Sequence, residues 1–137
     1  MPQQNTEAAM DALPTWRAAP GERAGRFEGA ADGSEVSFFV IHMGAGQGPA
    51  LHSHPYSETF VVLEGRARFE LGARSIEAAA GDVVVAPPGK PHMFRAVGAE
   101  ALRMVNIHAA PRMETTWLEA SPKSAAAPAS SASARPL

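Results

Sequence analysis

The fold of this chain is most constrained by a series of short apolar segments separated by glycine and proline. Each segment has six to ten residues, and most are rich in β-branched or aromatic side chains. Short strands at regular spacing, with turn residues between them, are typical of an all-β sandwich or barrel. The predicted strands are 34–43, 58–64, 66–71, 73–78, 82–87, 91–97, 101–109 and 113–119. The only near-helical stretch is 5–13, and its pattern is weak.

Length and composition place these strands in one domain. The chain has 137 residues, of which 45% are hydrophobic, so one domain with a real core is expected. We expect a flexible N-terminal arm over 1–15 and a barrel domain over 16–119, starting near Trp16. The segment 120–137 is dominated by Ala, Ser and Pro, and we expect a disordered tail because it buries too little to offset the ordering entropy.

Charge and composition exclude several classes of partner. The net charge is −2 and no Lys/Arg cluster is present, which argues against nucleic acid and anionic membranes as partners. The sequence has no run of about 18 apolar residues, so no membrane span is predicted. The N-terminus lacks the pattern of a signal peptide. We therefore expect a soluble, cytoplasmic protein. The absence of cysteine excludes disulfides and thiolate ligands.

Two glycines indicate specific turns. In the stretch 87–90, Pro88 presets φ and Gly89 supplies the positive φ of a type II turn. The proline that follows biases the residue before it to an extended conformation, so His92 should start a strand in a fixed direction. Gly65 follows a predicted strand and favours a hairpin turn or a G1-type bulge.

Two histidines and a carboxylate lie within seven positions in the stretch LHSHPYSETF. In a strand, residues i and i+2 point to the same face, so His52 and His54 should project together. Glu58 shares its parity with Phe60 and Val62, and it faces the interior if they do. An interior carboxylate is costly unless it is paired or bound to a metal. Two neutral imidazoles carry no permanent charge, whereas a divalent cation would neutralise this carboxylate.

Two blocks of the sequence resemble the paired motifs of the cupin superfamily, over about residues 34–109. The first block has Gly46, five residues, His52-x-His54, three residues, Glu58, six residues and Gly65. The second has Gly81, five residues, Pro87-x-Gly89, two residues and His92. The second motif usually ends with Asn, and this chain has Ala96 there. The resemblance to a small single-domain cupin implies a double-stranded β-helix, or jelly-roll barrel, in which His52, His54, Glu58 and His92 bind one metal.

Three imidazoles and one carboxylate, without thiolate, suit Mn, Fe, Co, Ni or Zn. Four protein ligands leave up to two positions on an octahedral ion, where substrate, dioxygen or water can bind. Two alternatives stay open. The histidines are buried and satisfied by hydrogen bonds, or the metal serves stability alone.

Further residues are candidates for the site. We expect the substrate pocket to be lined by Phe38, Phe60, Phe94, Met104, His42 and His108. His42 and His108 have three possible places: at the cavity mouth, behind a ligand, or outside the barrel. Tyr56 is expected to donate to a bound substrate or to lie at the surface, and Glu58 is the candidate catalytic base.

The sequence therefore favours a mononuclear metal enzyme that acts on a small, partly apolar organic substrate. The expected chemistry is that of an oxidoreductase such as a dioxygenase, or of an isomerase or cyclase. The alternative is a non-catalytic, metal-containing module that binds or senses a small molecule. Because cupin barrels often dimerise through edge strands and terminal arms, we also expect a homodimer that buries Trp16, Trp117 or both.

Overall fold

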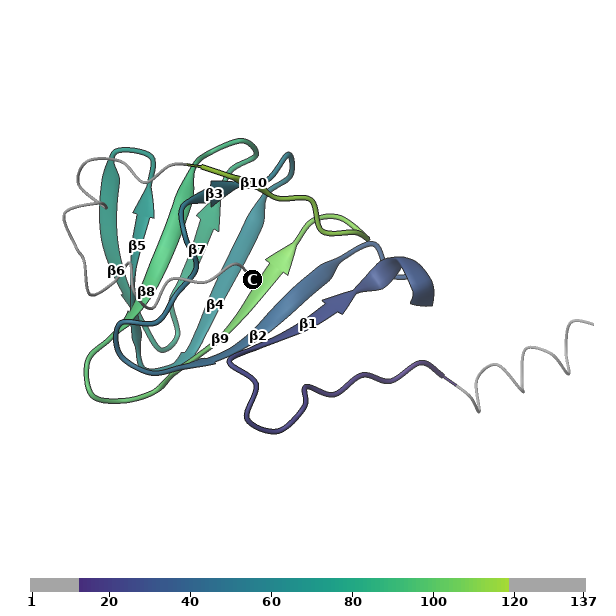
Figure 1. Cartoon of the computed structure of the whole chain (residues 1–137), viewed down its shortest axis with the longest axis horizontal. Coiled ribbons are helices and arrows are strands. Elements are labelled where there is room, and N and C mark those ends of the chain that lie inside the picture. Colours follow the sequence, from purple (N-terminus) through teal and green to yellow (C-terminus); the bar gives the residue numbers. More distant parts are fainter. Residues whose placement is uncertain (1–12, 119–137) are drawn as a thin grey trace, which may run out of the picture.

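The structure is a computed structural model that describes residues 13–118. This part of the chain forms ten β-strands and one turn of 3-10 helix (Figure 1). The elements are β1 (Ala24–Glu28), η1 (Gly29–Asp32), β2 (Ser37–Met43), β3 (His52–Ser53), β4 (Glu58–Glu64), β5 (Arg66–Leu71), β6 (Arg74–Ala79), β7 (Val83–Ala86), β8 (His92–Val97), β9 (Leu102–His108) and β10 (Thr116–Trp117). None of the described residues forms a helix long and apolar enough to cross a membrane.

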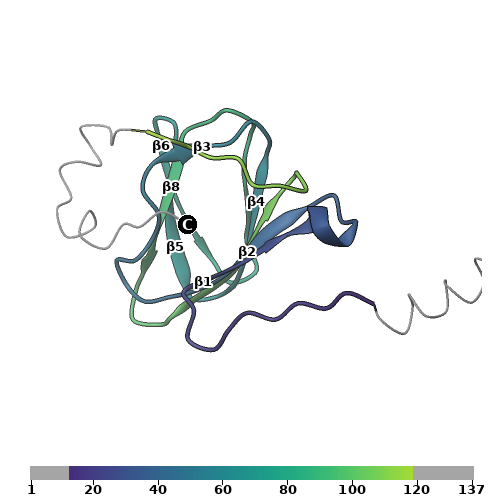
Figure 2. The same cartoon turned by 45° about the vertical axis from the view of Figure 1, so that its right-hand side comes forward.

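The strands form two five-stranded antiparallel sheets. One sheet has the order β1-β2-β9-β4-β7 and the other the order β10-β3-β8-β5-β6. In the turned view of Figure 2 the two sheets wrap around a common interior. Because sequence neighbours such as β4 and β5 lie in different sheets, the chain crosses between the sheets repeatedly. The predicted all-β jelly-roll barrel is confirmed.

The barrel interior is filled by alternate side chains of the strands. On β4 the buried positions are Glu58, Phe60 and Val62, and every second residue between them is less buried. Phe60 packs edge-on against Phe69 of β5, with ring centroids 4.8 Å apart, and it also contacts Phe94 of β8 at 6.1 Å. Phe60 lies 5.8 Å from the ring of His92 as well, so the hydrophobic core continues directly into the histidines.

Most predicted strands are present: 58–64 and 66–71 have the predicted ends, and the ends of the others differ by at most three residues. The segment 34–43 becomes the strand 37–43, and of the segment 113–119 only Thr116 and Trp117 are paired as a strand. The strand β1 was not predicted, because AGRFE has few β-branched residues and buries only its glycine fully. Of the near-helical stretch and the N-terminal arm, the structure describes only the residues from 13 onward. The C-terminal tail lies outside the described residues.

The type II turn is confirmed. Gly89 has a φ of 76°, and the N–H of Lys90 donates to the carbonyl of Pro87 at 3.2 Å. The hairpin expected at Gly65 is wrong, because the strands that flank it belong to different sheets. Gly65 has a φ of 77°, and a Cβ there would lie 2.5 Å from the carbonyl oxygen of Ala101. This corner therefore requires glycine. The irregularity lies earlier, where the register of β4 against β9 shifts at Leu63.

Candidate metal centre

The candidate site is built from two cross-strand pairs, one on each sheet. Glu58 of β4 lies opposite His108 of β9, and His52 of β3 lies opposite His92 of β8. All four side chains are buried. His54 follows β3 directly and is buried with them. The two sheets thus bring five polar side chains to one end of the barrel interior.

The type II turn fixes the two histidine segments relative to each other. The N–H of Gly89 donates to the carbonyl oxygen of His54 at 2.7 Å. His92 follows Gly89 by three residues. Because a backbone hydrogen bond joins the turn to the segment that carries His54, these two imidazoles are held by a rigid backbone connection.

Three of the imidazoles are oriented by backbone carbonyls. Nδ1 of His52 lies 2.7 Å from the oxygen of Ala50, Nδ1 of His54 lies 2.8 Å from that of Glu114, and Nδ1 of His92 lies 2.9 Å from that of Lys90. A carbonyl only accepts, so each Nδ1 carries the proton and donates. In the neutral ring, Nε2 then has the free lone pair. Such a contact behind a histidine is the usual way in which a metal-binding tautomer is fixed.

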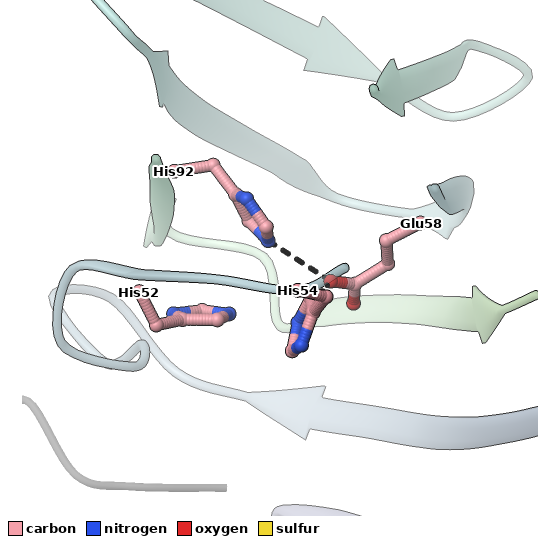
Figure 3. Close-up of side chains that lie close together, drawn as sticks. All are labelled: His52, His54, Glu58 and His92. Carbon is pink, nitrogen blue, oxygen red and sulfur yellow. Dashed lines mark hydrogen bonds and ion pairs between the residues drawn. The ribbon is translucent and has the colours of Figure 1, made fainter. Parts of the chain in front are cut away.

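The carboxyl of Glu58 lies among these rings (Figure 3). Its Oε1 is 3.0 Å from Nε2 of His54 and 2.9 Å from Nε2 of His92, while its Oε2 is 3.1 Å from Nε2 of His108. The ligand atoms of His52, His54, Glu58 and His92 all lie within 4.8 Å of one another. Two donors on opposite sides of one first-row ion are roughly 4.2 Å apart. A contraction of roughly 0.6 Å between the two most distant ligand atoms would therefore close this set around one ion.

The hydrogen bonds of the described residues leave this cluster incomplete. Nε2 of His54 is buried without a hydrogen-bond partner there, although Glu58 is only 3.0 Å away. A lone pair and a carboxylate oxygen at that distance repel each other unless a proton or a cation lies between them. His92 bonds Glu58 through Nε2 and a carbonyl through Nδ1, which requires a ring with two protons. A divalent cation would meet both requirements, so the residues fit a metal.

Burial and neighbouring groups favour the ligand forms of the titratable groups. Burial, and then the charge of His92, lower the pKa of His52 to about 4. Burial raises the pKa of Glu58, but contacts with His108, His54 and His92 outweigh it and hold that pKa well below the usual range. At neutral pH, His52 is therefore a neutral imidazole and Glu58 a carboxylate, the forms that a metal binds.

The space beside the cluster is small. The pocket is lined by Phe39, His52, His54, Glu58, Phe94, His108, Thr115 and Trp117. It offers about 10 Å³ to a water-sized molecule, which is room for about one water. Thr115 and Trp117 belong to the segment around β10, which pairs with β3 and places Trp117 opposite His52. A larger ligand would therefore have to displace this segment.

The structure places most of the predicted pocket residues inside the barrel. Phe60, Phe94 and Met104 are 1% exposed, but of these three only Phe94 lines the pocket. His108 lies within the cluster itself. Tyr56 is partly buried and does not line the pocket, and its hydroxyl lies 2.7 Å from Nδ1 of His108.

Two of the predicted pocket residues lie outside, and these predictions are wrong. In β2 the buried positions are Ser37, Phe39, Ile41 and Met43, so Phe38 and His42 face outward. The ring of Phe38 packs on Phe27 at 4.6 Å and on Trp16 at 5.3 Å. His42 is exposed. The stretch SFFVIHM is apolar at both parities, so alternation alone did not distinguish its two faces.

Phe39, Thr115 and Trp117 line the pocket, although the sequence did not predict them there. Phe39 would have followed from the correct parity of β2. Thr115 and Trp117 reach the pocket only because β10 pairs with β3, a contact between segments more than 60 residues apart. No local sequence pattern predicts such a contact.

Known proteins similar to this chain have the same fold. A family model described as a cupin domain matches residues 38–108, which is more than half of the 137 residues. The chain therefore belongs to the cupin family. The matched range begins in β2 and ends in β9.

Individual relatives are similar over parts of the chain. A polyketide synthase, CurC, of Streptomyces cyaneus is 43% identical over 61 residues, which cover 44% of this chain and 39% of that protein. A Klebsiella pneumoniae protein with a double-stranded β-helix domain has a TM-score of 0.61 and 27% identity, covering 80% of this chain and 94% of that one. The oxalate decarboxylase of Bacillus subtilis, which has Mn(II) centres, has a TM-score of 0.64 and 20% identity, covering 75% of this chain and 30% of that one. At 20% identity this last likeness shows the fold alone.

Proposed function

We propose that this cupin binds one divalent first-row metal through His52, His54, Glu58 and His92, and that it is an enzyme acting on a small organic substrate. The observation that carries the proposal is the short distance between three imidazoles and one carboxylate. Their ligand atoms lie within 4.8 Å of one another, and all four residues are buried. The buried Nε2 of His54, without a hydrogen-bond partner among the described residues, supports a cation at that point.

The protein's own residues would hold and shape the reaction site. A bound ion would supply Lewis-acid chemistry or the activation of dioxygen. Backbone carbonyls orient the imidazoles of His52, His54 and His92, so that their Nε2 atoms face the proposed metal site without a charged group behind them. Glu58 is the candidate base, since its carboxyl is ionised at neutral pH and lies at the pocket wall. Phe39, Phe94 and Trp117 would exclude water.

The lining of the pocket favours a partly apolar substrate. No Lys or Arg is among the residues that line it, which argues against a phosphorylated ligand. Phe39, Phe94 and Trp117 provide aromatic walls. The similarity to a polyketide synthase over 61 residues favours a substrate with several enolisable carbonyl groups, on which a cyclase, isomerase or dioxygenase could act.

Elemental analysis tests the metal. The untagged protein, the His52→Ala variant and the His42→Ala variant are purified in parallel, and Mn, Fe, Co, Ni and Zn are quantified. His42 is a matched control, because it is an exposed histidine on the outer face of β2. We expect about one equivalent of metal in the wild type and in His42→Ala, and none in His52→Ala. Equal, substoichiometric metal in all three samples would contradict the proposal.

A non-catalytic binding or sensor module is the second candidate, because the described residues form a single barrel without a second domain that could close over a substrate. The metal-loaded protein is offered phenols, β-diketones and enols, and both substrate loss and dioxygen uptake are followed. Turnover that is lost in Glu58→Gln would support the enzyme. Saturable binding of such compounds without turnover would support the module instead.

We further propose that the protein is a homodimer and that it functions in the cytoplasm. Trp16 and Trp117 are 36% and 42% exposed in the single chain, so both have apolar surface that a partner could cover. Sedimentation at micromolar concentration tests the assembly, and a monomer there would contradict it. Fractionation of the source cells tests the compartment.

A further inference from the structure

His108 differs from the other three buried histidines in how its ring is held. Its Nδ1 lies 2.7 Å from the hydroxyl of Tyr56, whereas Nδ1 of the others faces a backbone carbonyl. The Tyr56 oxygen also accepts a hydrogen bond from the backbone N–H of Glu114 at 3.0 Å. A hydroxyl can donate as well as accept, so the tautomer of His108 depends on the direction of one hydrogen bond.

The donors and acceptors around Tyr56 determine the direction of this hydrogen bond. The Tyr56 hydroxyl has one proton, and its oxygen already accepts from the backbone N–H of Glu114, so this proton is available for His108. If the hydroxyl donates to Nδ1 of His108, then the Glu114 N–H, the Tyr56 O–H and Nδ1 of the imidazole all have partners. The proton of His108 then resides on Nε2, 3.1 Å from Oε2 of Glu58. In the reverse tautomer the lone pair of Nε2 would face that carboxylate oxygen.

The two oxygens of Glu58 have different neighbours. Oε1 lies against Nε2 of His54 and Nε2 of His92, at 3.0 and 2.9 Å. Oε2 lies against His108. Nε2 of His108 has no hydrogen-bond partner among the described residues, and with a proton on Nε2 a small rotation of the ring or the carboxyl would complete a hydrogen bond to Oε2. The cross-strand pairing of Glu58 with His108 keeps the two groups within reach.

We propose that Tyr56 and His108 form a positioning pair that binds Oε2 of Glu58 and thereby turns Oε1 toward His54 and His92, where the metal would bind. This inference rests on the metal site proposed above. It assigns His108 the Nε2–H tautomer and places it behind the carboxylate, outside the set of metal ligands. Tyr56 then acts through His108 and does not contact the substrate.

The tautomers can be observed directly. Long-range ¹H–¹⁵N correlation spectra of the full chain, labelled with ¹⁵N-histidine, are recorded at pH 8 after chelation and again with one equivalent of zinc. Single His→Gln variants assign the five rings. We expect the Nε2–H tautomer for His108 in both samples, and zinc-shifted Nε2 resonances only for His52, His54 and His92. A zinc-shifted Nε2 of His108, or an Nδ1–H tautomer, would overturn the proposal.

This experiment separates the two proposals. If zinc moves none of the histidine resonances, the metal site fails, whereas the chelated sample still reports the tautomer of His108. If zinc binds and His108 has the Nδ1–H tautomer, the metal site stands and the positioning pair fails.

Variants test the consequence for metal affinity. Loss of a group that orients a ligand typically weakens metal binding by roughly 10- to 100-fold. We expect a loss of that size in His108→Leu, a smaller loss in Tyr56→Phe, and near wild-type affinity in His108→Gln, whose amide N–H can still donate to Oε2. His42→Gln is the control. Circular dichroism checks folding, and Tyr56→Phe is the milder change if His108→Leu does not fold. Unchanged zinc affinity in both His108→Leu and Tyr56→Phe would overturn the proposal.

Discussion

The barrel interior contains an apolar region around Phe60, Phe69 and Phe94, and a polar region formed by Glu58 and the four buried histidines. The strands β4 and β8 contribute to both: Phe60 follows Glu58 by two residues, and Phe94 follows His92 by two. In the apolar region three rings pack with centroids 4.8–6.1 Å apart. In the polar region, buried nitrogens lie near a carboxylate without hydrogen bonds among the described residues.

One strand pattern thus serves both stability and binding. Side chains in the apolar region gain free energy from leaving water and from close packing. Side chains in the polar region lose their hydrogen bonds to water, and the contacts among the described residues replace only some of these bonds. We therefore expect the apolar region to stabilise the fold, and the polar region to depend on a bound ion and on pH.

The largest effect is expected from Phe69→Ala in the apolar region. Phe69 is fully buried, and truncation of a buried Phe usually lowers the free energy of unfolding by roughly 3–5 kcal/mol. Ile76→Ala is the matched control, because Ile76 pairs with Phe69 in register but is 38% exposed. We expect a change within about 1 kcal/mol for it. Urea unfolding measures both, and equal losses would refute a dominant apolar region.

Acid should destabilise the metal-free protein through the polar region. The pKa of His52 falls from 6.5 to about 4 on folding, so between these pH values the unfolded chain binds more protons. The free energy of unfolding therefore decreases as pH falls through this window, by up to about 3 kcal/mol. The lowered pKa of Glu58 acts in the same direction, at pH values below its usual 4.5.

The His52→Gln variant isolates the first part of this effect. Without the imidazole, the free energy of unfolding should vary less between pH 6.5 and 4 than in the wild type. Chelated samples of both proteins are unfolded in urea at several pH values. Identical pH profiles would mean that His52 does not carry the effect.

Metal should stabilise the polar region by mass action. A ligand that binds only the folded state adds about 2.7 kcal/mol at a free concentration of 100 times its Kd. We expect a higher Tm with added zinc or manganese, reversed by a chelator, in the wild type and in His42→Ala. His52→Ala should show no such shift. A metal-induced rise in Tm that survives in His52→Ala would place the ion elsewhere.

The sequence predicted the polar region better than it predicted the walls around it. His52, His54, Glu58 and His92 were found because the motif spacing and the parity of short strands both refer to local sequence. His92 was also aimed by a turn whose residues dictate its geometry, and Gly89 has the expected positive φ.

The failures have a physical cause in contacts between distant segments. Phe38 was placed inside because it is apolar, yet β1 and Trp16 cover it on the outer face. The strand β1 has a weak composition and exists because it pairs with β2. Trp117 joins the site through a pairing with His52 that no local pattern shows.

The smallest expected effect has the opposite sign and concerns Asn106, on the border between the two regions. Asn106 is fully buried, neither atom of its amide has a hydrogen-bond partner among the described residues, and its cross-strand neighbours are Phe39 and Phe60. A buried polar group without a partner costs roughly 1–3 kcal/mol. Asn106→Leu should therefore raise the free energy of unfolding, by about 1 kcal/mol after some loss from imperfect packing.

Urea unfolding of Asn106→Leu measures this effect, and Asn106→Ala serves as the control that removes the amide without filling the space. A gain in Asn106→Leu with a loss in Asn106→Ala would show that the amide itself is unfavourable for folding. In that case Asn106, two positions before His108, lowers the free energy of unfolding at the border of the polar region. A loss in both variants would instead indicate that the amide is satisfied, as by a buried water, and would extend the hydrogen-bonded polar region one step further into the barrel.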